Sequence, residues 1–560
     1  MTVGSAVLRD SIMAYRRKLS GTALLLILHQ AGEALVPVLV GVVIDKAVRV
    51  GDPKALVFWL ALLGVDFLVL SNSHRIGAQY SWQCQARADQ RLRMQVTERV
   101  LDARGGAESA LLPGALVNVA VSDAKRVAQL HLALPFGVAA LVAFIVAGVA
   151  LLRISLPLGL LILLGSPPLL LLLRALGRPL RRRSGAEQER AAHAAGIAAD
   201  LVQGIRVLKG LGAEGAAVRR YTRGSRESLT ATLHAGAAQG WYQGAVLAVN
   251  GLFLALIALV GGRLAAEGSI SIGELVSAVG LAQFLLGPLN VFGRVVSAVS
   301  QARASADRLA TVLSTPPAVI GGGEPPGQPV VGGLRIEQLR HGALTRLDLR
   351  VAPGELLGVV SADPASVVAL LECLNRETDP DSGRIELDGT PLTELDPGGL
   401  RGAILVSAHN AELFAGTVRE NVTAAAAQGA DPGPALRAAQ ADEVASALPA
   451  GLDSPVSEQG RSLSGGQRQR VALARALAAD APVLVLHDPT TALDSVTEAR
   501  VAEALGHIRA GRTTIVATTS PAILAACDRV VTVEDGALRA SGSHAELVRE
   551  DADYRALVLA

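Results

Sequence analysis

Leu463-Ser464-Gly465-Gly466-Gln467-Arg468-Gln469-Arg470 is the stretch that decides how the second half of this chain is interpreted. The residues after it, 471–479, are rich in Ala, Leu and Arg and therefore favour a helix. Ser464 and the two glycines then lie at the start of that helix, where free backbone N–H groups and the helix dipole favour an anion. The stretch predicts an anion-binding helix start.

The chain around this stretch, from residue 334 onward, alternates short apolar runs with Ala-rich segments. Such alternation indicates an α/β domain. Segments 356–360, 482–486 and 514–517 are predicted as strands. A phosphate-binding loop of the form GxxxxGK[ST] normally joins a strand to a helix, but the chain contains no such motif.

The first half of the chain is strongly apolar. The 560 residues are 50% hydrophobic with a mean hydropathy of +0.40, which is unusual for a soluble protein. A membrane-spanning helix needs about 20 mostly apolar residues. Six segments are predicted to span a membrane: 21–44, 55–75, 131–152, 155–175, 239–262 and 273–295.

Basic residues set the expected orientation in the membrane. Arginines are frequent before the first predicted span and in the long connections 76–130 and 176–238, and are fewer in the short connections. Because basic loops stay on the cytoplasmic side, we expect both termini and both long connections to be cytoplasmic. The basic lead-in predicts a retained first span rather than a cleaved signal peptide.

The remaining bulk properties exclude other classes. A formal net charge of +2 does not suggest nucleic-acid binding. Cys84, Cys373 and Cys527 lie far apart without metal-binding spacing, so we expect reduced structural thiols and no metal site. The Pro- and Gly-rich segment 313–333 is predicted to be a linker between the two halves.

The chain as a whole resembles the ABC exporter family. Its signature motif, LSGGQ, is complete at 463–467 and is preceded by a family-like segment at 457–460. Segment 491–494, ending in Asp494, is similar to the D-loop. Three segments of the first half, 113–127, 200–214 and 301–309, are similar to the coupling regions and to the exit from the sixth span. The resemblance implies a half-transporter with a six-helix transmembrane domain at 1–312, a linker at 313–333 and a P-loop NTPase-like nucleotide-binding domain at 334–560.

Several residues that the family uses to hold its own ATP are replaced. In the phosphate loop, other residues stand at three glycine positions, at the lysine and at the Mg²⁺-binding hydroxyl. Elsewhere the Walker B aspartate, the catalytic glutamate, the switch histidine and the Q-loop glutamine are replaced. These positions are Ser361, Pro364, Ser366, Val367 and Val368 in the loop, and His487, Asp488, Thr518 and His409 elsewhere. Asp363 adds a negative charge beside the loop, and His487, without a neighbouring ligand at metal spacing, is a poor ligand for Mg²⁺, which prefers oxygen.

The retained and lost residues divide according to which ATP they serve. In an ABC dimer, the resemblance implies, Ser464, Gly465, Gly466, Gln467 and Asp494 act on the ATP held by the partner. We therefore expect a subunit of a heterodimer that supplies its signature to a partner with intact Walker motifs. The partner would hold ATP and Mg²⁺, and this chain alone would have little or no ATPase activity.

Three ionisable residues lie within predicted membrane spans. His29 and Glu33 share one face of the first span, and Asp66 lies in the second. Ionisable groups inside a membrane are costly, so they usually face the bundle interior or water. Two interpretations stay open: a polar substrate site, or side chains that line an outer vestibule or bond to neighbouring helices.

The expected activity is ATP-driven export across the cell membrane of a small amphiphilic, peptide, lipid or drug-like molecule. The alternatives are an ABC-type importer half, a non-catalytic regulatory or channel-like membrane protein on the same fold, and a decayed paralogue. The intact signature and D-loop argue against the last of these.

Overall fold

The computed structural model describes residues 3–409 and 412–559, and the chain forms two compact units. The first unit comprises Met1–Thr97 and Gly114–Leu313, and the second comprises Glu98–Pro113 and Ser314–Ala560. The second unit therefore includes a short segment from the first half of the chain.

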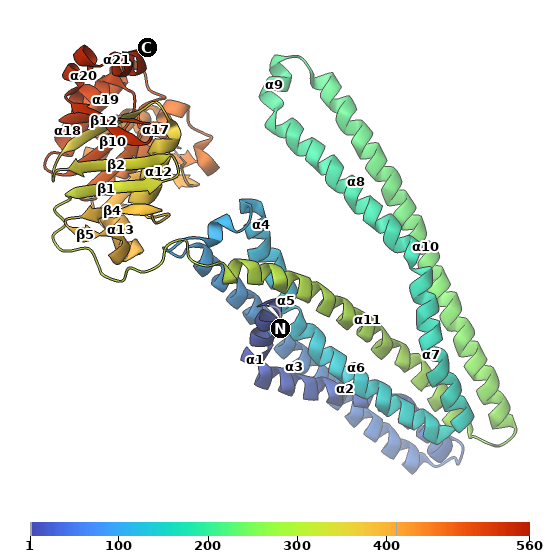
Figure 1. Ribbon diagram of the computed structural model, residues 1–560. Helices are drawn as coiled ribbons and strands as arrows, with labels where there is room; N and C mark the ends of the chain where they lie inside the picture. Colours follow the sequence, from blue (N-terminus) through green and yellow to red (C-terminus); the bar gives the residue numbers. More distant parts are fainter. Residues whose placement is uncertain (1–2, 410–411, 560) are drawn as a thin grey trace. The chain divides into compact units, whose positions relative to one another are not determined.

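Within the described residues, six helices of the first unit are long and apolar enough to cross a membrane. Each overlaps one of the segments predicted from hydropathy, which confirms the six-helix prediction (Figure 1). Their helical cores are α2 (Arg16–Val43), α3 (Pro53–Val100), α6 (Leu130–Ile154), α7 (Leu156–Leu176), α10 (Glu214–Ala266) and α11 (Ile272–Ser314). The other elements are α1 (Val3–Ala14), η1 (Ile44–Val48), α4 (Pro113–Asn118), η3 (Val119–Asp123), α5 (Ala124–Ala128), α8 (Arg178–Gln203) and α9 (Ile205–Gly210).

Local sequence explains how these helices begin and pair. Ser155 ends α6 in extended geometry and caps α7, accepting a hydrogen bond from the Leu158 N–H at 3.5 Å. A one-residue turn of this kind makes α6 and α7 antiparallel neighbours. Beyond the apolar part of α7, α8 lies along α10 over most of its length (Figure 1).

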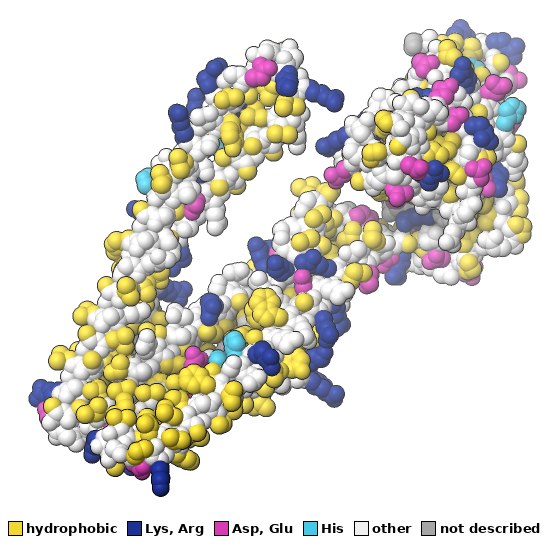
Figure 2. Space-filling view, turned by 180° about the vertical axis from the view of Figure 1, so that it is seen from behind, with side chains coloured by type: hydrophobic (Ala, Val, Ile, Leu, Met, Phe, Trp, Pro, Cys, Tyr) yellow, Lys and Arg dark blue, Asp and Glu magenta, His cyan; other side chains and the backbone are white. Residues whose placement is uncertain are grey.

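Apolar side chains cover much of the outer surface of the first unit (Figure 2). Leu68 on α3 is 65% exposed, and Leu247 and Leu259 on α10 are 76% and 71% exposed. Large exposed apolar surfaces are rare on soluble monomers and mark contact with lipid or a partner. This surface agrees with a multi-pass membrane protein.

A buried carboxylate joins two segments that are far apart in the sequence. Asp123 is fully buried in η3. It accepts hydrogen bonds from the Ser305 hydroxyl at 2.8 Å and from Arg308 Nε at 2.7 Å. A buried charge is tolerated when it is paired and hydrogen-bonded. The first coupling-like segment and the end of α11 are thus fixed together.

The second unit is built on a ten-stranded sheet, which confirms the α/β prediction. The strand order is β5-β4-β1-β2-β12-β11-β3-β10-β9-β6. The strands are β1 (Leu334–His341), β2 (Leu344–Val351), β3 (Leu356–Ser361), β4 (Ser382–Leu387), β5 (Thr390–Pro391), β6 (Ile404–Ser407), β9 (Val483–His487), β10 (Thr513–Ala517), β11 (Arg529–Glu534) and β12 (Ala537–Gly542). β7 (Gly416–Thr417) and β8 (Pro455–Val456) form a separate pair.

Helices flank the sheet, and the longer ones carry the residues discussed below (Figure 1). They are α12 (Pro364–Leu374), α13 (Pro397–Ala403), α14 (Val418–Thr423), α15 (Gly433–Ala438), α16 (Ala441–Ala447), α17 (Gly465–Ala478), α18 (Ser495–Ile508), α19 (Pro521–Ala526), α20 (His544–Glu550) and α21 (Ala552–Leu559). The short 3₁₀ turns are η2 (Ala107–Ser109), η4 (Leu392–Glu394), η5 (Gly451–Asp453) and η6 (Glu458–Gly460).

Strands β11, β3, β10, β9 and β6 are parallel to one another. They read as continuous apolar runs because both faces of a parallel sheet are covered by helices. Leu357, Val485 and Ile515 are at most 1% exposed. Parallel strands end at one edge, so residues that follow β3, β6, β9 and β10 are brought together there.

Arg376 fixes the segment before β1 to this unit. Its side chain is 1% exposed. Nη1 donates to the Leu395 carbonyl at 2.5 Å, while Nη2 donates to the Thr393 carbonyl at 3.0 Å and the Ile320 carbonyl at 3.2 Å. The guanidinium thereby binds the backbone at three positions, one of which, Ile320, lies before β1. Asp379 balances its charge at 3.1 Å.

Candidate functional site

The candidate site lies at the carboxyl edge of the parallel strands, where α/β proteins commonly bind ligands. Its first part is the loop between β3 and α12. Asp363 is the N-cap of α12 and accepts a hydrogen bond from the Ala365 N–H at 3.0 Å. Its other carboxylate oxygen accepts the Ser366 hydroxyl at 2.9 Å. The start of α12 therefore already holds a negative charge supplied by the chain itself.

The positions that correspond to the lysine and the Mg²⁺-binding hydroxyl offer no polar group. Val367 is buried in the sheet core, at 7% exposure, and Val368 points outward at 42% exposure. The Ser361 hydroxyl donates to the Asp363 backbone carbonyl at 3.1 Å and accepts the Asp363 N–H at 3.2 Å. This loop therefore presents a carboxylate and no ammonium group at the start of α12.

The ends of β6 and β9 form the second part. His409 Nδ1 and His487 Nε2 each lie 3.8 Å from Asp488 Oδ2, and the two imidazole rings are 5.6 Å apart. No neighbouring ligand of His487 was predicted from the sequence, and the pairing of β6 with β9 brings His409 beside it. Burial lowers the pKa of His487, so its imidazole is neutral near pH 7.

The space between these side chains is small. The cavity beside His409, His487 and Asp488 measures about 20 Å³. That volume holds one water molecule and no phosphate group. Among the described residues no group of His, Cys, Asp and Glu is arranged to hold a metal ion.

Thr518, at the switch position, takes part in local structure. It is 6% exposed, and its N–H donates to the Val359 carbonyl at 3.1 Å. Its hydroxyl accepts the Ser520 N–H at 3.2 Å, just before the Ser520-Pro521 start of α19. The side chain is thus committed to a turn.

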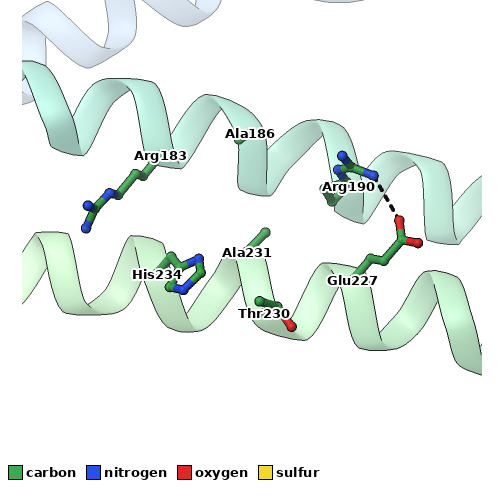
Figure 3. A pocket seen from close by; sticks show the side chains of 7 residues that line it. All are labelled: Arg183, Ala186, Arg190, Glu227, Thr230, Ala231 and His234. Carbon is green, nitrogen blue, oxygen red and sulfur yellow. Dashed lines mark hydrogen bonds and ion pairs between the residues drawn. The ribbon is translucent and has the colours of Figure 1, made fainter.

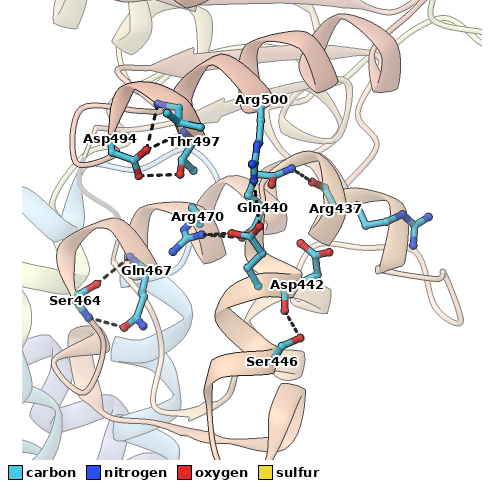
Figure 4. Close-up of polar contacts among 12 residues, drawn as sticks. Arg437, Gln440, Asp442, Ser446, Ser464, Gln467, Arg470, Asp494, Thr497 and Arg500 are labelled. Carbon is cyan, nitrogen blue, oxygen red and sulfur yellow. Dashed lines mark hydrogen bonds and ion pairs between the residues drawn. The ribbon is translucent and has the colours of Figure 1, made fainter.

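The signature stretch has the geometry of an open helix start (Figure 4). Ser464 is exposed and is the N-cap of α17. A capping box joins it to Gln467: the Ser464 hydroxyl accepts the Gln467 N–H at 3.3 Å, and the Gln467 amide oxygen accepts the Ser464 N–H at 2.9 Å. Only one donor of the first turn is used by the Ser464 side chain, so the surface around it remains suited to an anion.

The D-loop lies against this helix start. A Cβ on Gly466 would meet the Ala492 carbonyl oxygen at 2.8 Å, so the close approach requires glycine. Gln469 braces the same segment: its amide donates to the Asp488 carbonyl at 2.8 Å, and its oxygen accepts the Ala492 N–H at 2.7 Å. Sequence reasoning missed this brace, because the contact joins residues about 20 positions apart.

Asp494 caps the next helix. Its carboxylate accepts the N–H groups of Val496 and Thr497, at 3.1 and 3.0 Å, and the Thr497 hydroxyl at 2.7 Å (Figure 4). The Thr497 N–H and hydroxyl lower the pKa of Asp494. Glu443 forms ion pairs with Arg470 of α17 at 3.4 Å and with Arg500 of α18 at 3.3 Å. One carboxylate therefore links the helix that follows the signature to the helix that follows the D-loop.

The ionisable residues of the spans lie in two different places in the first unit. His29 Nε2 is 3.6 Å from Glu33 Oε2, and both line a cavity of about 370 Å³ together with Phe136 and Arg294. Asp66 does not line that cavity; it lies against Gly32 on α2, and its Oδ2 is buried without a hydrogen-bond partner. The structure therefore brings His29 and Glu33 together and leaves Asp66 apart.

Comparisons with known proteins agree with this geometry. Residues 20–289 match the ABC transporter transmembrane region, and residues 344–491 match the ABC transporter domain. The chain is 29% identical to a multidrug efflux ATP-binding/permease protein of Mycobacterium tuberculosis, over 98% of this chain and 46% of that protein. It is 30% identical to the ATP-dependent lipid A-core flippase of Thiobacillus denitrificans, over 70% of this chain and 69% of that protein.

A third relative, the lipid A-core flippase of Cupriavidus metallidurans, is 31% identical over 68% of this chain and 66% of that protein. The chain spans just under half the length of the mycobacterial protein and about two thirds of the flippases. Six apolar helices, a P-loop-like sheet domain and an intact signature helix accompany these matches. The chain therefore belongs to the ABC transporter family, with an exporter-type transmembrane region and an ATP-binding domain in one polypeptide.

Proposed function

We propose that this chain is the degenerate subunit of a heterodimeric ABC exporter. One observation carries the proposal: of the two helix starts in its nucleotide-binding domain that could bind a phosphate, one is occupied by a carboxylate of the chain and the other is open. The start of α12, which would hold the chain's own ATP, is occupied by the Asp363 carboxylate. The start of α17, which would face a partner's ATP, is exposed and formed by Ser464, Gly465 and Gly466.

The position that corresponds to the catalytic glutamate also supports a heterodimer in which the partner holds and hydrolyses ATP. Asp488, in place of the catalytic glutamate, faces two histidines across a cavity that holds a single water. The partner would supply the phosphate loop, the Mg²⁺ ligands and the general base, while this chain closes the site with Ser464 and orders it through Gln469 and Asp494. Residues 1–312 would form the transmembrane domain and 334–560 the ATP-binding domain, with both termini in the cytoplasm.

The transported molecule is proposed from the relatives and from the cavity in the spans. The relatives are named for multidrug efflux and for lipid A-core flipping. The cavity lined by His29 and Glu33 combines apolar walls with a few charged groups. A small amphiphilic substrate that carries a polar group fits this lining.

The proposal predicts the ATPase activity of the purified chain. Alone in detergent or nanodiscs it should hydrolyse ATP at least about 100-fold more slowly than when purified with a partner half-transporter that has intact Walker motifs, because a general base and a phosphate-binding lysine each contribute factors of this order. Robust hydrolysis by this chain alone would rule the proposal out. ATP-independent substrate flux would instead favour a channel-like protein.

Glu33 and Asp66 are predicted to differ in their effects on transport. Glu33→Gln should change the transport rate of a cationic amphiphile by about tenfold, because the variant removes a charge from the cavity wall. Asp66→Asn, a matched loss of one carboxylate, should leave the ratio of rates for cationic and neutral substrates within about twofold. The measurement is the rate of uptake of both substrates into inverted vesicles. If the two variants change these rates equally, Glu33 does not belong to the substrate site.

A further inference from the structure

Two contacts align α10 with the junction of α7 and α8 and with α8 itself, on the side of the membrane expected to be cytoplasmic. A Cβ on Gly177 would lie 3.3 Å from the Tyr242 ring, so these residues are neighbours. Farther along, Arg190 of α8 and Glu227 of α10 form an ion pair at 2.8 Å. Between the two contacts the helices leave a cavity of about 550 Å³, into which Arg183 and His234 point (Figure 3).

This cavity carries an excess of positive charge. Glu227 is the acidic residue of its lining, and Arg190 already neutralises it. Among the described residues Arg183 belongs to no ion pair, and the pair in the cavity lining is Arg190 with Glu227. Arg178, Arg181 and Arg182 are exposed within two turns of Arg183 on the same helix.

The position of the cavity relative to the membrane follows from its distance along the helices from two aromatic residues. Trp241 is 58% exposed and Tyr242 lies beside Gly177, at the inner end of the apolar part of α10. Such residues mark the membrane interface. Arg183 is six residues beyond Gly177, about 9 Å along a helix. The headgroup layer extends about 5–8 Å beyond the hydrocarbon core, so the backbone of Arg183 lies just outside it. The Arg183 side chain points back toward the N-terminal end of α8 (Figure 3), which brings its guanidinium to the level of the headgroups.

We infer that the cavity between α8 and α10 binds the headgroup of an anionic phospholipid from the cytoplasmic leaflet. The Arg183 guanidinium matches a phosphodiester through paired N–H donors. His234, also in the lining, supplies a further donor. On the membrane side, the exposed side chains Leu171, Leu172 and Leu247 offer an apolar surface for acyl chains, which a free phosphate ion would not use. The inference uses the cytoplasmic placement of α8 proposed above and is independent of the heterodimer.

The native tryptophans allow a direct test in the full-length chain. The chain has three tryptophans, so Trp59→Phe and Trp82→Phe leave Trp241 as the single reporter. In nanodiscs, brominated phosphatidylglycerol should quench Trp241 at a mole fraction about fivefold lower than brominated phosphatidylcholine, because one basic group near an anionic headgroup contributes a preference of about this size. Equal quenching by the two lipids would overturn the inference.

Variants distinguish lipid binding in this cavity from a general attraction of anionic lipids to the basic residues of the region. Arg183→Gln with His234→Gln should bring the ratio of the two lipids close to one, whereas Arg183→Lys should keep most of the preference. Arg219→Gln, an exposed arginine on the same helix α10 but about 22 Å farther from the membrane than His234, should change nothing. A preference that survives in the double variant, or that 20 mM inorganic phosphate abolishes, would contradict a lipid site here.

Discussion

Replacing Ser464 with Arg should lower the ATPase rate of the purified pair by at least about 100-fold. Ser464 is exposed at the start of α17, and in the proposed dimer it closes on the γ-phosphate region of the partner's ATP. A long cationic side chain there would block closure and remove donors that act on developing charge, and loss of one such donor costs roughly 100- to 1000-fold. The measurement is steady-state phosphate release by the pair in nanodiscs.

The matched control for Ser464 lies in the other helix start of the same domain. Ser361→Arg makes the same chemical change beside α12, where Asp363 already occupies the anion position. That variant should keep the pair's activity within about twofold, and Val367→Lys alone should not create a second active site. Loss of the N-cap at Ser464 costs only about 1 kcal/mol, so the variant should remain folded. Full activity in Ser464→Arg, or equal loss in both serine variants, would contradict the proposed asymmetry.

Replacing Arg376 with Met should destabilise the nucleotide-binding domain by about 3–5 kcal/mol. The side chain is buried, and the change leaves the carbonyls of Leu395, Thr393 and Ile320 without their donor. It also leaves Asp379 without its ion-pair partner. Hydrogen bonds to a charged group contribute about 1.5–3 kcal/mol each, and three of them are lost. Differential scanning calorimetry of the full-length chain should show a transition lowered by about 10 °C.

Arg384→Met provides the comparison for Arg376. Arg384 is 55% exposed and pairs with Glu337 and Glu386 on the sheet surface, at 2.7 and 3.0 Å. Exposed ion pairs contribute about 0–1 kcal/mol, so this variant should shift the transition by no more than about 3 °C. If both variants shift it equally, the network around Arg376 does not fix the segment before β1 as described.

The prediction of the overall fold from the sequence succeeded because its signals are local. Six runs of about 20 apolar residues need no knowledge of their neighbours to be recognised as spans. The strand at 356–360 and the helix after Ser464 likewise show themselves through composition and capping residues. Asp363-Pro364 was also a readable signal, since Asp at an N-cap followed by Pro at the first helical position is a common helix start.

The parts that could not be predicted depend on pairing between distant segments. His409 and His487 meet because β6 lies beside β9, and nothing in either strand specifies that neighbour. The carbonyls that Arg376 binds come from segments up to 56 residues away in sequence. Glu33 and Asp66 appear alike as charged residues in apolar runs, and only the packing of α2, α3 and α6 separates the one that lines a cavity from the one that does not.

The Asp363 carboxylate has a further consequence for how the pair would respond to the energy state of the cell. In the proposed pair that carboxylate takes the place of a nucleotide at α12, so only the partner's site exchanges ATP for ADP. A dimer with two exchangeable nucleotides can respond cooperatively, whereas one with a single exchangeable nucleotide follows a simple saturation curve with a Hill coefficient of one. The pair should then turn over in proportion to the occupancy of one site, as a transporter whose rate is graded by ATP rather than switched by it.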